Sequence, residues 1–344
     1  MTVKLLDVSQ IPAIKAEIDN KTKPLGSLGK IEDLALRLGL IYGSKNPKIS
    51  EPTLYLCAGN HGIADSGVSA YPSEVTAQML LNFANGGAAI NVLSEANGIN
   101  LEFVNAGVDM NGFEVDGRFN APISAGTKSF ATHRAMTSDD CRAAVALGKE
   151  RVQMRIQDGS NFTLLGEMGI GNSSSAAVIT SLITGVELDQ CVGRGTGLSD
   201  EMLRNKKEVL SRALSFHGEI TDPMEILEVF GGLEIAALVG VILASAENGL
   251  PILVDGFITT SAVLIAAALH PNLRDYLIFS HVSLEPGHKF AVDHLLGDAL
   301  LNLNLRLGEG SGAALAFPLV NGAAEILSKM ATFQSASVST SGES

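Results

Sequence analysis

The sequence predicts an α/β fold in which a parallel β-sheet is flanked by helices. Short apolar runs alternate along the chain with amphipathic, helix-like stretches, which is the rhythm of βαβ units. Most of these runs end in Gly, Asp, Asn, His or Glu, as polar clusters do at the carboxyl ends of parallel strands. Apolar residues make up 46% of the 344 residues and charged residues 18%, so a sizeable core can be buried.

Five candidate strands follow one another in this rhythm. They are residues 53–58, 101–106, 162–165, 252–254 and 276–279. Together they predict a Rossmann-like large domain over residues 46–289. Because ligands of open α/β sheets bind beyond the carboxyl ends of the strands, the polar residues that follow each run become candidates for a site.

The two ends of the chain differ from this centre. Residues 11–41 and 296–333 are mostly helical in pattern. We therefore expect a small helical domain built from residues 1–45 and 290–335. Residues 336–344 are rich in serine and predict a frayed tail.

Composition excludes several classes of function. The formal net charge of −13 argues against nucleic acid and against an anionic membrane surface as partners. The three cysteines form no CxxC pair, and the first residues lack the apolar run of a signal peptide, so we expect a reducing, cytoplasmic setting. Residues 235–270 are very apolar, but Glu247 and Asp255 interrupt them, which favours core helices and a buried strand over a membrane span.

Glu309 is the first candidate for chemistry. It lies between glycines in residues 306–312 (RLGEGSG), where small side chains let the backbone approach a ligand closely. A glutamate held there is a plausible general base. A helix-capping turn with a solvated glutamate explains this segment equally well.

Two glycine-rich loops are candidates for binding a phosphate. Residues 166–175 (GEMGIGNSSS) follow a strand and precede a helix-like segment, so backbone N–H groups and serine hydroxyls can meet an anion. The spacing fits neither a dinucleotide nor a triphosphate motif, and a capped tight turn is the alternative. Residues 193–199 form the second loop, and Lys206 and Lys207 follow it, although a solvated lysine pair is the simpler interpretation.

Other polar residues give weaker signals. His281, Glu285 and His288 do not have the spacing of a metal site, because Pro286-Gly287 interrupts any shared helical face, so we predict no metal and no cofactor. Asp255 and Asp109 can hold ribose hydroxyls or close a strand-end turn, and the residues alone favour neither.

Taken together, these segments resemble the nicotinate-nucleotide:dimethylbenzimidazole phosphoribosyltransferases of cobamide assembly. Any one segment is a weak signal, but nine in order with compatible spacing are specific. The matching segments are residues 23–29 (KPLGSLG), 60–63 (NHGI), 71–76 (YPSEVT), 86–91 (GGAAIN), 166–174 (GEMGIGNSS), 231–237 (GGLEIAA), 255–257 (DGF), 280–288 (SHVSLEPGH) and 306–312.

The resemblance implies transfer of 5-phosphoribose from nicotinate mononucleotide to an aromatic base such as 5,6-dimethylbenzimidazole, giving an α-ribotide and nicotinate. It places the general base at Glu309 and implies a dimer. It assigns Glu167, Gly169, Lys206 and Ser283 to the nucleotide and its phosphate, and we add Gly171, Asn172, Arg306 and Gly308 as candidates for the same role. Those assigned to the acceptor are Tyr71, Pro72, Met79 and Leu307.

Two departures from the family pattern leave alternatives open. Asn60 stands where the family commonly has Asp, and Tyr71 and Met79 stand where some members have Ser and Gln near the acceptor's distal nitrogen. Some members use phenol or p-cresol within a complex of paralogous subunits, so a phenolic acceptor and a heterodimer are alternatives to a benzimidazole and a homodimer. A non-catalytic supporting subunit is a further alternative, which Glu309 disfavours.

Overall fold

The computed structural model describes residues 2–110, 119–195 and 197–339. Its centre is a parallel sheet with strand order β2-β1-β3-β4-β5-β6. The order reverses between β1 and β3, which makes their carboxyl ends the topological switch point where ligands of such sheets bind. The strands are β1 (Thr53–Gly59), β2 (Asn100–Gly107), β3 (Thr163–Met168), β4 (Ile252–Val254), β5 (Leu277–Ser283) and β6 (Ala299–Leu305).

All five expected strands are present, so the predicted α/β class is confirmed. The expectation that residues 296–333 are mostly helical was wrong for β6, which pairs with β5 at the edge of the sheet. Side chains of β6 are only partly buried or exposed, whereas every residue of β1 is buried. An edge strand of this kind lacks the continuous apolar run by which a strand buried on both faces is recognised.

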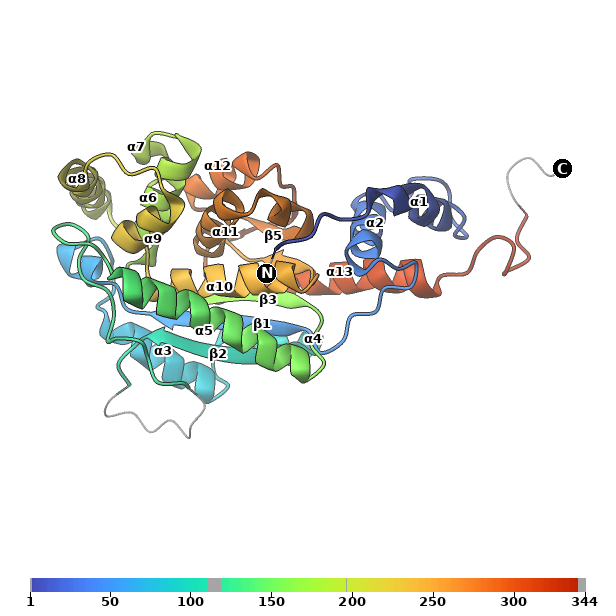
Figure 1. The fold of residues 1–344 in the computed structure, drawn as a ribbon, viewed down its shortest axis with the longest axis horizontal. Coiled ribbons are helices and arrows are strands. Elements are labelled where there is room, and N and C mark those ends of the chain that lie inside the picture. The colour runs from blue at the N-terminus through green and yellow to red at the C-terminus, as the bar shows by residue number, and fades with distance from the viewer. Residues whose placement is uncertain (1, 111–118, 196, 340–344) are drawn as a thin grey trace.

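Helices cover both faces of the sheet (Figure 1). They are α1 (Ile11–Asp19), α2 (Lys30–Tyr42), α3 (Glu74–Ala84), α4 (Ala89–Asn97), α5 (Ser138–Gln157), α6 (Asn172–Thr184), α7 (Leu188–Cys191), α8 (Asp200–His217), α9 (Pro223–Phe230), α10 (Leu233–Glu247), α11 (Phe257–Leu269), α12 (Pro286–His294) and α13 (Ser311–Lys329). Short 3₁₀ turns complete the chain at η1 (Val8–Gln10), η2 (Gly62–Ser66) and η3 (Pro271–Tyr276).

The two faces of the sheet form two separate hydrophobic cores. In β1, Tyr55 and Cys57 point to the core made with α5, α6, α10 and α11, while Leu54 and Leu56 point to the core made with α1 to α4 and α13. This alternation follows from the two-residue period of a strand. The apolar stretch 235–270 belongs to the first core as α10, β4 and α11, as expected. None of the helices in the described ranges is long and apolar enough to cross a membrane.

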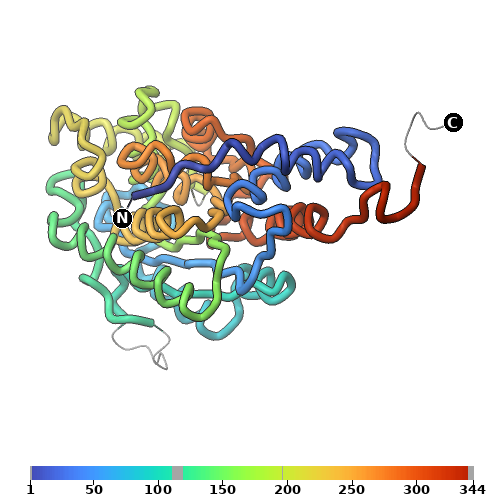
Figure 2. Tube along the Cα trace, turned by 45° about the vertical axis from the view of Figure 1, so that its right-hand side comes forward, coloured from blue at the N-terminus to red at the C-terminus, as the bar shows by residue number. Residues whose placement is uncertain are grey.

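The terminal helices lie together at one end of the molecule (Figure 2), where α2 packs along α13 and α1 packs on α2. Ile14 of α1, Leu38 of α2 and Leu327 of α13 share one core with Leu54 of the sheet. The division into a domain of residues 46–289 and a small one from both termini stays a prediction. Residues 340–344 of the expected frayed tail lie outside the described residues.

Candidate active site

A cavity of about 450 Å³ lies beyond the carboxyl ends of β3, β4 and β5, where their loops meet the segment after β6. The predicted site residues that line it are Tyr71, Met79, Glu167, Gly169, Gly171, Asn172, Ser283, Arg306, Leu307, Gly308 and Glu309. Two predicted residues, Pro72 and Lys206, are not among its lining residues. The structure therefore gathers into one cavity segments that are more than 200 residues apart in the chain.

Glu309 has the least relaxed backbone in the cavity wall. Its φ is 62°, and its neighbours Gly308 and Gly310 have φ of 86° and 83°. A residue with a side chain rarely adopts this conformation, which costs about 1–3 kcal/mol and is found mostly where function requires it. The Glu309 side chain is 6% exposed, and its Oε2 has no hydrogen-bond partner among the described residues. Burial raises the pKa of Glu309, the backbone N–H of Ile90 opposes that shift, and the Asp255 charge adds to it.

Asp255, which directly follows β4, holds the turn that contains Glu309. Its carboxylate accepts hydrogen bonds from the backbone N–H of Gly310 at 3.2 Å and of Ala313 at 3.0 Å, which caps the start of α13. Its Oδ1 lies 3.9 Å from Nδ1 of His281, and burial raises the pKa of Asp255. Asp255 thus closes the turn before α13, and because it also lines the cavity, the ribose contact considered in the sequence stays a prediction.

Glu167 lies beside Glu309 at the end of β3. Its Oε2 accepts a hydrogen bond from Asn172 at 2.5 Å, and a Cβ added at Gly308 would overlap its Oε1. Burial raises the pKa of Glu167 to about 8, and the charges of Asp255, Glu234 and Glu309 contribute. Burial first, and then the neighbouring carboxylates, therefore favour the protonated form of Glu167.

The helix α6 begins in the cavity wall, after Gly169-Ile170-Gly171. Gly171 is the residue before the first turn of α6 and has φ of 99°, which suits glycine. In the described chain, no side chain caps α6 and no acidic residue lies in its first turn. The positive end of the helix dipole therefore meets the cavity at Asn172 and Ser173, which favours an anion there.

Lys206 of α8 lies one layer behind this wall. It is fully buried, and its Nζ donates to Oγ of Ser173 at 2.8 Å and to the carbonyl oxygen of Gly193 at 3.3 Å. Burial lowers the pKa of Lys206 to about 8, and the Glu285 charge opposes that shift. The alternative of a solvated lysine pair is wrong for Lys206 but holds for Lys207, which is partly exposed and pairs with Asp189.

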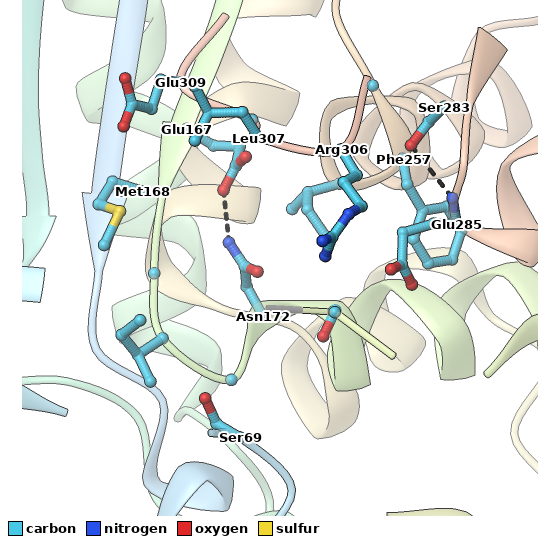
Figure 3. A pocket seen from close by; sticks show the side chains of 18 of the residues that line it. Ser69, Glu167, Met168, Asn172, Phe257, Ser283, Glu285, Arg306, Leu307 and Glu309 are labelled. Carbon is cyan, nitrogen blue, oxygen red and sulfur yellow. Dashed lines mark hydrogen bonds between the residues drawn. The ribbon is translucent and has the colours of Figure 1, made fainter. Parts of the chain in front are cut away.

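Ser283, the last residue of β5, and Glu285 lie on the side of the cavity away from Glu309, and Arg306 lies between the two sides (Figure 3). The Ser283 backbone N–H donates to Nδ1 of His288 at 3.0 Å, and its hydroxyl accepts from the Glu285 N–H at 3.3 Å. Burial raises the pKa of Glu285, while the Lys206 charge, the Gly195 N–H and the Arg306 charge lower it. Burial lowers the pKa of His288 to about 3, so this ring is neutral.

Apolar side chains form the remaining wall. Tyr71 and the α3 residues Val75 and Met79 lie there together with Met168 of β3 and Leu307. Such a wall can bury a flat aromatic ring. Pro72, which the sequence placed in this wall, is not part of it, although Tyr71 beside it is.

Several residues that line the cavity were not predicted from the sequence to belong to the site. The family pattern contains Phe257 directly after Asp255-Gly256, and Glu285 two positions after Ser283, so their place after β4 and β5 was a usable signal. Val75 lies one helical turn before Met79, which was a second signal. The further lining residues that were not assigned are Val68, Ser69, Met168, Ile170, Ser173, Gly195, Ile258 and His281.

Within residues 2–110, 119–195 and 197–339, no group of three or more His, Cys, Asp or Glu side chains is arranged to hold a metal ion. Of the residues considered above as ligands, His288 accepts the Ser283 N–H at its Nδ1, and the Glu285 carboxyl lies near the Gly195 N–H and the charges of Lys206 and Arg306. Asn60, the departure from the family's Asp, does not line the cavity, and its Oδ1 is buried without a hydrogen-bond partner in the described chain.

The chain is similar to known proteins over nearly its whole length. A family model described as phosphoribosyltransferase matches residues 3–338. The nicotinate-nucleotide–dimethylbenzimidazole phosphoribosyltransferase of Cupriavidus necator is 50% identical over 335 residues, 97% of each chain. The protein of the same name from Ralstonia nicotianae is 47% identical over 339 residues, 98% of this chain and 96% of that one.

Solved structures agree with these matches. The crystal structure of CobT from Thermus thermophilus superposes with a TM-score of 0.93 at 39% identity, covering 97% of this chain and 100% of that one. A second structure from the same organism, titled as the nicotinate-nucleotide–dimethylbenzimidazole phosphoribosyltransferase, gives a TM-score of 0.92 at 38% identity and covers 98% and 100% of the two chains. The resemblance seen in the sequence is confirmed: this chain belongs to the nicotinate-nucleotide–dimethylbenzimidazole phosphoribosyltransferase family.

Proposed function

We propose that this enzyme transfers 5-phosphoribose from nicotinate mononucleotide to 5,6-dimethylbenzimidazole, with Glu309 as the general base. The observation that carries the proposal is the state of Glu309. Its buried carboxylate is held at φ of 62° in the cavity wall, with one oxygen unpartnered among the described residues. A carboxylate in that state is ready to accept a proton from a bound acceptor.

The electron balance of the reaction requires a base and little else from side chains. The C1′–N bond to the pyridinium ring breaks, and its electron pair stays on nitrogen, so nicotinate leaves with a neutral ring. A nitrogen lone pair of the acceptor forms the new bond to C1′. The acceptor's N–H proton then passes to the Glu309 carboxylate. The raised pKa of Glu309, caused by burial, brings it closer to the pH of the reaction and makes it a stronger base.

The two sides of the cavity match the two substrates. The start of α6, Ser173, Ser283 and Arg306 offer an N-terminal helix dipole, hydroxyls and a cation to the donor's phosphate. Lys206 supports this side through its hydrogen bond to Ser173. The apolar wall with Tyr71 and Met79 suits the flat ring of the acceptor.

The test is a product assay with defined donors and acceptors. Purified enzyme is incubated with nicotinate mononucleotide and 5,6-dimethylbenzimidazole, and the ribotide and free nicotinate are measured by mass spectrometry. Equal amounts of the two products support the proposal. Formation of nicotinate without ribotide would show that the enzyme is a hydrolase. The absence of both products would overturn the proposed reaction.

A second arm offers phenol and p-cresol, alone and against an equimolar benzimidazole. Met79 and Tyr71 give the ring fewer polar contacts than Gln and Ser would, so rejection of a wrong ring depends on burial at about 25 cal/mol per Å² and is weak. We expect the benzimidazole to win the competition and phenols to be used slowly when alone. Exclusive use of phenols would show that the proposed acceptor is wrong, but it would not contradict the proposed donor or the role of Glu309.

The proposed assembly is a homodimer, as the resemblance implies. Light scattering on the purified chain measures its mass in solution and should give that of a dimer. A monomer that becomes active only with a paralogous chain would instead indicate a heterodimer. The cytoplasmic setting also stays a prediction and can be checked by cell fractionation.

A further inference from the structure

A buried His–Glu pair lies outside the cavity, directly behind residues 169–171, here called the glycine loop. His61 and Glu234 are 1% and 0% exposed, and Nε2 of His61 lies 2.5 Å from Oε1 of Glu234. His61 follows β1 and Glu234 lies in the first turn of α10. Neither residue lines the cavity, and the proposed reaction uses neither.

The pair packs against the glycine loop together with backbone and Ala64. A Cβ added at Gly169 would lie 2.6 Å from the Gly59 carbonyl oxygen, 3.0 Å from Oε1 of Glu234 and 3.3 Å from Cδ2 of His61. A Cβ added at Gly171 would lie 3.2 Å from Cβ of Ala64 and 3.3 Å from Cβ of His61. The imidazole and the carboxylate therefore contact the loop directly at Gly169, and the His61 Cβ contacts it at Gly171.

The hydrogen bonds around the pair fix its orientation. Oγ of Ser175 lies 3.2 Å from Nδ1 of His61 and 3.3 Å from the carbonyl oxygen of Gly231. Nε2 of His61 meets Oε1 of Glu234, so each ring nitrogen of His61 has a hydrogen-bond partner. The ring is held at both nitrogens and cannot rotate without breaking one of these bonds.

Stability alone gives no reason for this arrangement. Oε2 of Glu234 is buried, and it has no hydrogen-bond partner in the part of the chain that the structure describes. A Cβ at Gly59 would lie 2.6 Å from that oxygen, so the carboxylate is wedged against backbone. Leaving a buried carboxylate oxygen unpaired costs roughly 1–3 kcal/mol or more, which an apolar side chain of similar size would avoid.

We infer that His61 and Glu234 are positioning residues that hold the glycine loop, and with it the start of α6, in the place that binds the phosphate of the nucleotide donor. The inference rests on the proposed function, because it assumes that the donor's phosphate meets this helix terminus. Within the described chain the loop makes few other hydrogen bonds: the Ile170 N–H donates to Oγ1 of Thr76 at 3.2 Å, and the Asn172 N–H donates to the Gly169 carbonyl at 3.1 Å.

The pair acts on donor binding and not on proton transfer. A loop that shifts by a fraction of an ångström weakens contacts between backbone N–H groups and the phosphate, while Glu309 is held separately by Asp255. Loss of the pair should therefore raise the KM for nicotinate mononucleotide and leave kcat and the KM for the acceptor almost unchanged.

The test uses Glu234→Gln in the full-length enzyme, compared with Ser245→Ala as the matched control. Ser245 is fully buried near the other end of α10, and its hydroxyl bonds Oγ1 of Thr163 at 2.8 Å. Steady-state kinetics and thermal melting are measured on both. We expect about a tenfold higher KM for nicotinate mononucleotide in Glu234→Gln with kcat within threefold of wild type. The control should lower the melting temperature with no change in KM.

A change in melting temperature without a change in KM for Glu234→Gln would overturn the inference and leave the pair purely structural. If that variant does not fold, Ser175→Ala decides, because it removes the outer bond to His61, together with the bond to the Gly231 carbonyl, and leaves the His61–Glu234 bond in place. About a threefold rise in the donor KM supports the inference, and an unchanged KM overturns it. Calorimetric binding of nicotinate mononucleotide to the wild-type enzyme separates the two proposals. No binding to wild type would refute the proposed donor, whereas equal binding to wild type and variant would refute only the positioning role.

Discussion

The two sides of the cavity differ in what their charged groups contact. On one side, Glu309 and Glu167 are buried near Asp255, and burial raises the pKa of each of these carboxyls. On the other, Lys206 is buried behind Ser173 and its pKa falls to about 8. Figure 3 shows Glu309 and Ser283 on opposite sides with Arg306 between them. Desolvation disfavours the charged form of both kinds of group, which makes a carboxylate such as Glu309 a better proton acceptor. The preference of the other side for an anion comes from the start of α6 and Arg306, with Lys206 behind Ser173.

The largest expected effect comes from breaking the acidic side. Glu309→Gln should lower kcat by roughly 100- to 10,000-fold, the usual contribution of a positioned base. The KM for nicotinate mononucleotide should stay within threefold, because the amide keeps the shape of the wall. Steady-state kinetics check this.

Glu325→Gln is the matched control, since Glu325 lies on α13 and pairs only with exposed Lys329 among the described residues. It should behave like wild type. A Glu309→Gln enzyme that keeps more than a tenth of the wild-type kcat would show that another group takes the proton.

Breaking the cationic side should act on binding instead. Lys206→Met keeps the volume of the side chain and removes the charged hydrogen bond to Ser173, a bond worth about 1.5–3 kcal/mol. We expect the KM for nicotinate mononucleotide to rise about 10- to 100-fold and the KM for the acceptor to change little. Titration of Lys206 should also make the donor KM of the wild type rise as pH passes about 8.

Lys207→Met tests whether the neighbouring charge matters in general, because Lys207 lies on the same helix in a partly exposed pair with Asp189. It should leave both KM values unchanged. Equal effects from the two lysine variants would argue that α8 contributes only a diffuse positive field.

The acidic side can also be tested through stability. The folded pKa of Glu167 is about 8 and its ordinary value is 4.5, so the folded state binds more protons than the unfolded state between these pH values. The free energy of unfolding therefore falls as pH rises through this window. Glu167→Gln removes this pH-dependent contribution to stability. The melting temperature of the variant should therefore rise relative to that of wild type as the pH increases from 5 to 8.

Thermal melting at several pH values gives the result, with Glu95→Gln on the exposed surface of α4 as control. The difference between Glu95→Gln and wild type should not depend on pH. A constant difference for Glu167→Gln as well would mean that Glu167 is already ionised in the folded protein.

The smallest expected effect is that of a chelator. The pyridine ring leaves without a charge on nitrogen and the donor carries no pyrophosphate, so the proposed chemistry needs no metal. Excess EDTA should leave the rate of ribotide formation unchanged. A rate that falls in EDTA and returns with added magnesium or zinc would contradict this expectation and reopen the question of what neutralises the phosphate.

Local patterns were sufficient for much of this protein. Each strand that is buried on both faces could be predicted from its apolar run. The glycines around Glu309 indicated a backbone turn that a ligand can approach closely, next to a candidate base. The edge strand β6 was missed because its side chains are only partly buried, and a half-exposed strand has no continuous apolar signal.

The amino-acid sequence by itself determined the α/β class, the family and the segments that form the cavity, because periodicity and motif order are local properties of the chain. Only the tertiary structure decided that Lys206 lies behind Ser173, that Pro72 lies outside the cavity, and that Glu234 meets His61 across 173 residues. Contacts of this kind depend on how helices and loops pack on the sheet, and burial then sets the charge of each group. Neither the packing nor the resulting desolvation can be predicted from any single segment of the sequence.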